Sequence, residues 1–123
     1  MLTSNLILDQ LWKLDGNVLM NKSNIWKSKD RWNLKSEGSM VLIENVSENK
    51  VITRKENVVS EEVLVLNNVS QMWENGVPDN EGFFTLTDPD SEKVLTATTS
   101  NCLVMSGKQT LSDITFHFFL LAK

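Results

Sequence analysis

Five polar side chains in two stretches of the sequence are the best candidates for chemistry. They are Asn68 and Gln71 in the first stretch, and Asp88, Asp90 and Asn101 in the second. Amide and carboxylate groups on loops of a rigid β scaffold can hydrogen-bond the hydroxyl groups of a sugar without a covalent step. The alternative is that these side chains cap turns, as Asx residues in hairpin loops commonly do. These five residues are therefore the candidate ligand-binding residues of the chain.

Carbohydrate binding also needs an aromatic face for the apolar side of the sugar ring. The chain has four tryptophans and no tyrosine. Trp12, Trp32 and Trp73 fall in apolar strand segments, and Trp26 aligns with aliphatic residues of later segments. We therefore expect all four indole rings mainly in the core, which argues against strong sugar binding.

Catalytic groups are sparse. His117, the one histidine, lies between phenylalanines, and no oxyanion turn or third orienting group accompanies Cys102, the one cysteine. All five glycines are isolated, so no phosphate-binding glycine loop is present, and the acidic run from Asp88 to Glu92 lacks the glycine of a calcium loop. We predict a protein that is not an enzyme and that binds neither metal nor cofactor.

Length and charge limit the remaining classes. The 123 residues suit one domain with one hydrophobic core, and the net charge of −4 argues against a nucleic-acid partner. Basic residues gather only in the first third of the chain, where a solvated face is the simplest interpretation and an anion site is the alternative. They are Lys22, Lys27, Lys29, Arg31 and Lys35.

The N-terminus and the single cysteine bear on location. The apolar run before Asp9 is only three residues long, too short for a signal peptide or a membrane span, and one cysteine cannot form an internal disulfide. We expect a cytoplasmic chain or a fragment of a larger protein. A glycan or glycoprotein is the expected partner, and a homo-oligomer is left open.

The elements that carry these residues are short strands. No window shows an apolar period of 3.6 residues, whereas runs of Val, Ile, Leu, Thr and aromatic residues alternate with turn residues, which predicts an all-β fold. We expect strands near residues 5–8, 11–14, 17–21, 25–28, 32–35, 40–45, 50–54, 62–66, 71–74, 83–87, 93–98, 102–106 and 115–121.

The sequence also repeats. A shift of 43 places Phe84 over Val41, and each copy then runs to an aromatic strand 22 residues after a valine: Val51 to Trp73, and Val94 to Phe116. A shorter third copy fits residues 17–35, apparently without its third strand. Three units of about four strands, at about 1–38, 39–81 and 82–123, predict a single β-trefoil domain whose units share one core.

The motifs Gln10-x-Trp12 and Gln71-x-Trp73, each followed by a hairpin, resemble the Gln-x-Trp strands of ricin B-type (R-type) lectin domains. The resemblance implies a β-trefoil that binds sugars in shallow pockets, without catalysis or metal. On this basis we predict that the five candidate residues bind carbohydrate: Asn68, Gln71, Asp88, Asp90 and Asn101. The sequence departs from the family at the position of the sugar-binding aspartate, where it has Thr53 and Thr96. A protein-interaction module on the same scaffold is therefore the alternative function.

Overall fold

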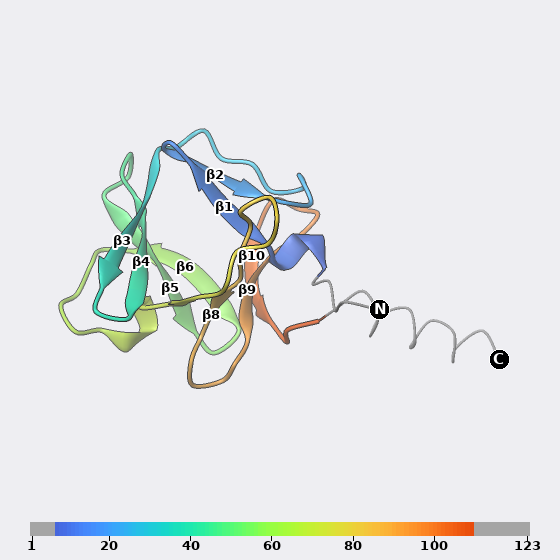
Figure 1. Cartoon of the computed structure of the whole chain (residues 1–123). Helices are drawn as coiled ribbons and strands as arrows, with labels where there is room; N and C mark the ends of the chain where they lie inside the picture. The colour runs from blue at the N-terminus through green and yellow to red at the C-terminus, as the bar shows by residue number, and fades with distance from the viewer. Residues whose placement is uncertain (1–6, 110–123) are drawn as a thin grey trace.

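The computed structural model describes residues 7–109, which form ten short β-strands and two 3-10 turns (Figure 1). The strands are β1 (Trp12–Asp15), β2 (Val18–Asn21), β3 (Trp32–Glu37), β4 (Met40–Asn45), β5 (Lys50–Lys55), β6 (Val58–Glu62), β7 (Glu74–Asn75), β8 (Leu86–Thr87), β9 (Val94–Ala97) and β10 (Leu103–Ser106). The turns are η1 (Leu8–Gln10) and η2 (Val69–Gln71). The predicted all-β class is confirmed for this part of the chain.

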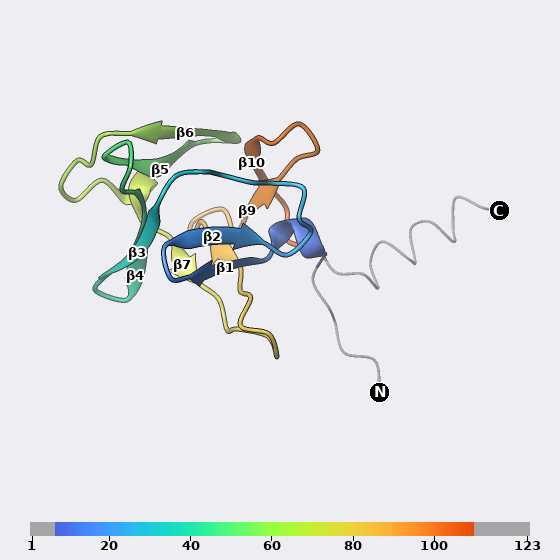
Figure 2. The same cartoon turned by 90° about the horizontal axis from the view of Figure 1, so that it is seen from above.

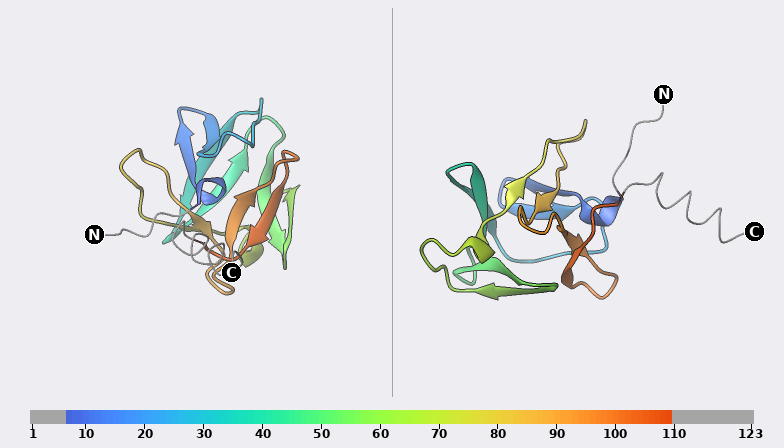
Figure 3. Two further views of the ribbon diagram at one scale, coloured as in Figure 1. Left: turned by 90° about the vertical axis from the view of Figure 1, so that its right-hand side faces the viewer. Right: turned by 90° about the horizontal axis from the view of Figure 1, so that it is seen from below.

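The strands form one large curled sheet and one separate hairpin. The large sheet has the order β3-β4-β5-β6-β10-β9-β8-β7, and β1 pairs only with β2 among named strands. Every strand pair is antiparallel. Figure 3 shows the strands curling around a common interior rather than stacking as two flat layers.

Two backbone bridges close this arrangement. Val41 in β4 exchanges hydrogen bonds with Trp73 just before β7, with N to O distances of 2.8 and 2.9 Å. The two ends of the large sheet therefore meet. Phe84 makes the same exchange with Trp12, at 2.8 Å in both directions, which joins the β1–β2 hairpin to the rest.

The core is built around the tryptophans. Trp26 packs edge-on against both Trp12 and Trp32, with ring centroids 5.3 and 5.8 Å apart. The buried apolar cluster consists of Trp12, Leu19, Trp26, Trp32, Ile43, Ile52, Trp73, Phe84, Leu86, Leu95, Ala97 and Met105. All four indole rings are buried, as the sequence predicts, and they are the largest side chains of this cluster.

Two of the indole N–H groups donate to equivalent carbonyls. Trp73 Nε1 donates to Ile52 O at 3.1 Å, and Trp12 Nε1 donates to Leu95 O at 2.9 Å. Ile52 and Leu95 are 43 residues apart, as are Val41 and Phe84. Trp12 thus occupies the position that the sequence predicts for Phe116, which lies outside the described residues.

Three of the four tryptophans each begin a hairpin and face a polar residue at its far end. Trp12 pairs with Asn21 and Trp32 with Asn45; the register Glu74 to Thr87 continues to Trp73 opposite Asp88. The three polar residues all accept hydrogen bonds from backbone N–H groups two or three residues later. These Asx turns direct the chain away from each hairpin.

Several expected strands differ from the structure. Residues 25–28 form no strand, Leu8 belongs to η1, and the 62–66 segment has no strand partner beyond Glu62 and enters a turn at Leu66. The strand before it, β6, lies at 58–62 because a two-residue turn at Glu56 and Asn57 follows β5 directly. The expected strand at 115–121 lies outside the described residues.

Candidate functional site

Asn68 and Gln71, predicted to bind sugar, both lie at η2. The Asn68 side chain accepts a hydrogen bond from Ser70 N at 3.0 Å and so caps the turn. Gln71 is 1% exposed; its Nε2 donates to Val63 O and Thr53 Oγ1, and its Oε1 accepts from Val65 N. Both amides therefore hold backbone in place, and sugar binding by them stays a prediction.

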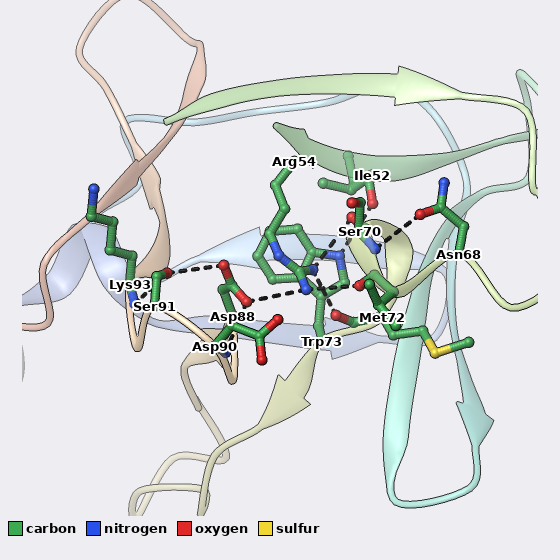
Figure 4. A network of polar contacts seen from close by, with 11 residues as sticks. Ile52, Arg54, Asn68, Ser70, Met72, Trp73, Asp88, Asp90, Ser91 and Lys93 are labelled. Carbon is green, nitrogen blue, oxygen red and sulfur yellow. Dashed lines mark hydrogen bonds and ion pairs between the residues drawn. The ribbon is translucent and has the colours of Figure 1, made fainter. Parts of the chain in front are cut away.

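Asp88 and Asp90 lie in the turn between β8 and β9, next to a buried arginine that the sequence analysis did not single out (Figure 4). Arg54 in β5 lies 3.2 Å from Asp88 Oδ1 and 4.7 Å above the Trp73 ring. Its guanidinium also donates to Val69 O, Ser70 O and Met72 O at 2.8, 3.3 and 2.6 Å. A cation within the alternating run of β5 is the only sequence signal of this site.

The Asp88 carboxylate responds to these neighbours. Partial burial acts to raise its pKa, but the Asp90 N–H, the Ser91 hydroxyl and the Arg54 charge together lower the pKa below its ordinary value. Asp90 itself is exposed and supplies only its backbone N–H, at 3.1 Å. The network fixes the β8–β9 turn against η2.

Asn101 is placed differently from the other four residues. It lies in the turn between β9 and β10 with φ 61°, and its side chain holds the backbone of Lys27 through two bonds. Asn101 Oδ1 accepts from Lys27 N at 2.7 Å, and Nδ2 donates to Lys27 O at 3.1 Å. The turn is thereby fastened to the long connection between β2 and β3, which runs across the molecule (Figure 2).

A hollow of about 290 Å³ opens beside this contact, and we call it the Trp26 hollow. Three parts of the chain meet there: the β2–β3 connection, the β5–β6 hairpin and the β9–β10 turn. It is lined by Trp26, Ile52, Val59, Ser60, Glu61, Asn101, Cys102 and Leu103. It therefore combines an indole ring, aliphatic side chains and three polar groups suited to hydrogen bonding.

The polar groups of the Trp26 hollow are held from behind. Glu61 Oε1 accepts from Asn45 Nδ2 at 2.7 Å, and this amide also donates to Asp30 Oδ2 at 2.8 Å. Asn101 uses one amide N–H and one lone pair on Lys27, and an amide side chain has a second of each. Both side chains are thus positioned while keeping capacity for a ligand.

Two other hollows lack this combination. One of about 610 Å³ lies beside the β8–β9 turn and is lined by Glu74, Gly76, Thr85, Thr87, Pro89, Ser91, Glu92, Lys93, Gly107 and Lys108, with no aromatic ring. The other, of about 180 Å³, reaches Trp26 from the β2 side and includes Lys27 but no predicted site residue. The Trp26 hollow is the one of the three that brings a predicted residue to an aromatic wall.

Lys22, one of the basic residues in the first third of the chain, forms ion pairs with two acidic side chains. Lys22 Nζ lies 2.6 Å from Asp79 and 3.2 Å from Glu81, and the hydrogen bond to Asp79 raises the pKa of the Lys22 ammonium. The same bond lowers the pKa of Asp79. Lys22 is therefore committed to these acids, which weakens the alternative of an anion site there.

Residues 7–109 contain no cluster of side chains suited to metal binding and no helix suited to crossing a membrane. No three His, Cys, Asp or Glu side chains gather there in a way that would hold a metal ion. None of the helical turns in this range has the length and apolar character needed to cross a bilayer. Cys102 is exposed, and His117, considered with it above, lies outside the described residues.

Comparison with known proteins gives one structural likeness. No known protein family and no curated protein matches the sequence. A chain in the crystal structure of the Haemophilus ducreyi cytolethal distending toxin is similar in fold, with a TM-score of 0.52 at 13% sequence identity. The match covers 82% of this chain and 80% of that chain. At this identity the likeness bears on the fold alone.

Proposed function

We propose that the chain is a single β-trefoil domain of the ricin B-type lectin kind, which binds carbohydrate and catalyses no reaction. Three tryptophan-led hairpins support the trefoil: β1–β2, β3–β4 and β7–β8. The offset of 43 residues between Val41 and Phe84, and between Ile52 and Leu95, supports an internal repeat. The bonds of Trp12 imply that the N-terminal Gln-x-Trp strand completes the unit that begins at Phe83.

Carbohydrate binding in this proposal belongs to the Trp26 hollow. The observation that carries it is that Asn101, a predicted sugar ligand, lies beside an indole ring in a hollow that three separate parts of the chain line. The 25–28 segment forms no strand, so no hairpin of its own covers Trp26 on this side. A missing hairpin strand in one unit is therefore what leaves room for a ligand.

The hollow matches the chemistry of a sugar. The apolar face of a pyranose ring packs against Val59, Leu103 and the small part of Trp26 that is accessible, 7% of that residue, and its hydroxyls bond to Asn101, Ser60 and Glu61. Recognition of this kind uses no acid, base or nucleophile. Affinity per site is weak, and useful binding comes from several linked sites.

Cys102 gives a direct test because its thiol lines the hollow. The full chain is first screened on a glycan array, and any sugar that binds is then added during alkylation of Cys102. We expect the bound sugar to slow alkylation. As a control, Ser91→Cys in a Cys102→Ser background places the thiol at the 610 Å³ hollow, where the same sugar is expected to give no protection.

Filling the hollow tests the location independently. Ser60→Trp places a large side chain in the hollow and is expected to abolish glycan binding, whereas Ser36→Trp, at an exposed position of β3 that does not line the hollow, is expected to leave binding intact. No response to any glycan at millimolar sugar would overturn the proposal.

A second candidate function is protein interaction on the same scaffold. The observation that favours it is a run of exposed aliphatic side chains after β6, separate from the Trp26 hollow. This function requires no sugar and would account for a negative glycan screen.

A further inference from the structure

The β2–β3 connection, which crosses the molecule in Figure 2, carries three cationic side chains. Lys27, Lys29 and Arg31 are all exposed, and none of them forms an ion pair within the part of the chain that the structure describes. Lys22 and Arg54, in contrast, are both paired with carboxylates. Five consecutive residues span at most about 18 Å, so the three unpaired charges share one small area of the surface.

Two residues that line the Trp26 hollow tie this connection to it. Asn101 bonds to both backbone groups of Lys27, at 2.7 and 3.1 Å. Glu61 and Asp30 accept hydrogen bonds from the same amide nitrogen, Nδ2 of Asn45, at 2.7 and 2.8 Å. The stretch from 27 to 30 is therefore anchored to the wall of the hollow at both of its ends and forms part of its rim.

The rest of the cationic stretch is held in place as well. Ser28 Oγ accepts from the indole N–H of Trp32 at 3.0 Å. Arg31 N donates to Ser47 Oγ at 2.8 Å, and Arg31 O accepts from Val46 N at 2.7 Å. A ligand therefore meets positive charge on a backbone that is already fixed, and binding has only side chains to order.

The rim and the wall of the hollow differ in charge. Residues 27–31 carry three positive charges and one negative charge, that of Asp30. The lining residues of the hollow include a single charged one, Glu61. Negative groups of a ligand are thus repelled from the hollow and attracted to the rim. Exposed charges more than about 8 Å away are largely screened at physiological ionic strength, so the net charge of −4 does not cancel this local pattern.

We propose that the carbohydrate bound at the Trp26 hollow is acidic, with its sulfate or carboxylate groups on Lys27, Lys29 and Arg31. The inference rests on the proposed function and specifies the class of glycan. An uncharged ring of the glycan occupies the hollow, and acidic groups of the same chain lie along the rim. Hydrogen bonds from ammonium and guanidinium groups to anionic oxygens are stronger than neutral ones and add affinity to a site that is weak without them.

A glycan fits this arrangement better than a nucleic acid or an anionic membrane. Single-stranded nucleic acid stacks its bases on open aromatic faces, and Trp26 is only 7% exposed. Membrane-binding segments gather about four to eight basic residues, whereas this stretch has three, with a carboxylate among them. A glycan combines hydroxyl groups for the hollow with widely spaced acidic groups for the rim.

An array that sets each acidic glycan beside its uncharged parent tests the proposal on the full chain. It holds sulfated, sialylated and uronic acid-containing glycans, so that sulfate and carboxylate are compared directly. We expect acidic glycans among those that bind, and at least about tenfold weaker binding of each uncharged parent at about 0.1 M salt. Raising the salt to about 1 M shortens the screening length to about 3 Å and should remove most of this difference.

Lys29→Glu and Lys55→Glu form a matched pair of variants. Both lysines are exposed and lack an ion pair among residues 7–109, but Lys55 lies on β5 and does not line the hollow. Lys29→Glu is expected to weaken binding of the acidic glycan at least about threefold, and Lys55→Glu is expected to leave it unchanged. Both variants should keep the Tm of the natural chain, because both positions are exposed.

The outcomes separate this inference from the proposed function. Uncharged parents that bind as well as acidic glycans, or a Lys29→Glu variant that binds acidic glycan normally, would overturn the inference and leave the proposed function standing. Acidic glycan that still binds after Ser60→Trp would overturn it too, since the rim would then act without the hollow. Equal binding to phosphatidylserine vesicles or to a single-stranded oligonucleotide would have the same meaning. If no glycan binds, the proposed function itself fails.

Discussion

The Gln10 turn (residues 8–12) and the Gln71 turn (residues 69–73) share one backbone arrangement and satisfy it differently. In the Gln10 turn, Asn21 Nδ2 donates to Asp9 O at 3.1 Å and to Leu11 O at 3.3 Å. In the Gln71 turn, Arg54 Nη1 donates to Ser70 O at 3.3 Å and to Met72 O at 2.6 Å. The carbonyls correspond, since Asp9 and Leu11 each lie 61 residues before Ser70 and Met72, the same separation as between Gln10 and Gln71.

The difference in donor has a consequence for charge. Asp88 stands in the Gln71 region where Asn21 stands in the Gln10 region, and a carboxylate cannot donate to the turn. Arg54 supplies the missing donor and Asp88 balances its charge at 3.2 Å. The carbonyl groups of both turns thus have a hydrogen-bond donor, which is an amide side chain in the Gln10 turn and a guanidinium group in the Gln71 turn. Because the donor in the Gln71 turn is charged, loss of either Arg54 or Asp88 leaves a buried charge unpaired and should lower the stability of the fold.

Removing Arg54 should give the largest effect. Arg54→Met removes the buried cation beside the Asp88 carboxylate and the guanidinium N–H donors of three backbone carbonyls, and we expect a loss of about 3–5 kcal/mol in the free energy of unfolding. Urea denaturation measures it, with Lys55→Met, an exposed neighbour on β5, as the control. A loss of about 1 kcal/mol or less, typical of exposed ion pairs, would show that the network does not stabilise the fold.

Gln10 and Gln71 each bond a backbone carbonyl and a backbone N–H group of one segment: Gly107 O and Gln109 N for Gln10, and Val63 O and Val65 N for Gln71. Removing either glutamine side chain should lower the free energy of unfolding by the same amount. Gln10→Leu and Gln71→Leu each leave a backbone carbonyl and an N–H group unpaired, for an expected loss of about 1–3 kcal/mol. Comparing the denaturation midpoints of the two single variants and the double variant tests both size and additivity. Markedly unequal losses would argue against equivalent roles.

The Gln10 turn carries a feature that its counterpart lacks. Asp9 stands where the other turn has Ser70; its Oδ1 is buried without a partner among residues 7–109, and burial raises the pKa of the carboxyl group. Because the ionised form is disfavoured in the folded state, Asp9→Ser should stabilise the protein at neutral pH, by at most about 0.5 kcal/mol. The gain should fade in acid, where Asp9 is protonated; a gain independent of pH would contradict this cause.

Asp88 should show the opposite dependence on pH. Its folded-state pKa lies below the unfolded value of 3.8, so its contribution is present above that value and is lost as the pH falls through the folded pKa. Thermal unfolding between neutral and strongly acidic pH should show part of the acid destabilisation disappear in Asp88→Asn. Asp90→Asn, an exposed neighbour, serves as the control and should retain the natural profile.

Much of the fold follows from local sequence. Alternating apolar residues and turn residues predict the strands at 40–45 and 50–54 well, because each pattern is decided within a few residues. Val41 and Phe84, which the offset of 43 aligns, each form a backbone bridge with a tryptophan. The same reasoning misplaces the strand near 62–66, because Val65 N bonds to a glutamine side chain rather than to a neighbouring strand.

The site is less accessible to sequence reasoning. The residue types place Asn101 among the predicted ligands. They do not reveal its two bonds to Lys27, which span 74 positions in the chain. Arg54 was not singled out at all, because its burial depends on Asp88 and on the carbonyls of η2. Contacts of this kind leave no local pattern in the sequence.

By itself, the sequence determines the all-β class and the strands near 40–45 and 50–54, since each depends on the properties of neighbouring residues. Only the tertiary structure decides which segments meet: Trp12 with Leu95, Asn101 with Lys27, and Arg54 with Asp88. The tertiary structure also leaves the side chains of Val63, Leu64, Val65 and Leu66 exposed. The reason is that chain closure over long separations depends on the packing of the whole core, and no short stretch of sequence carries that information.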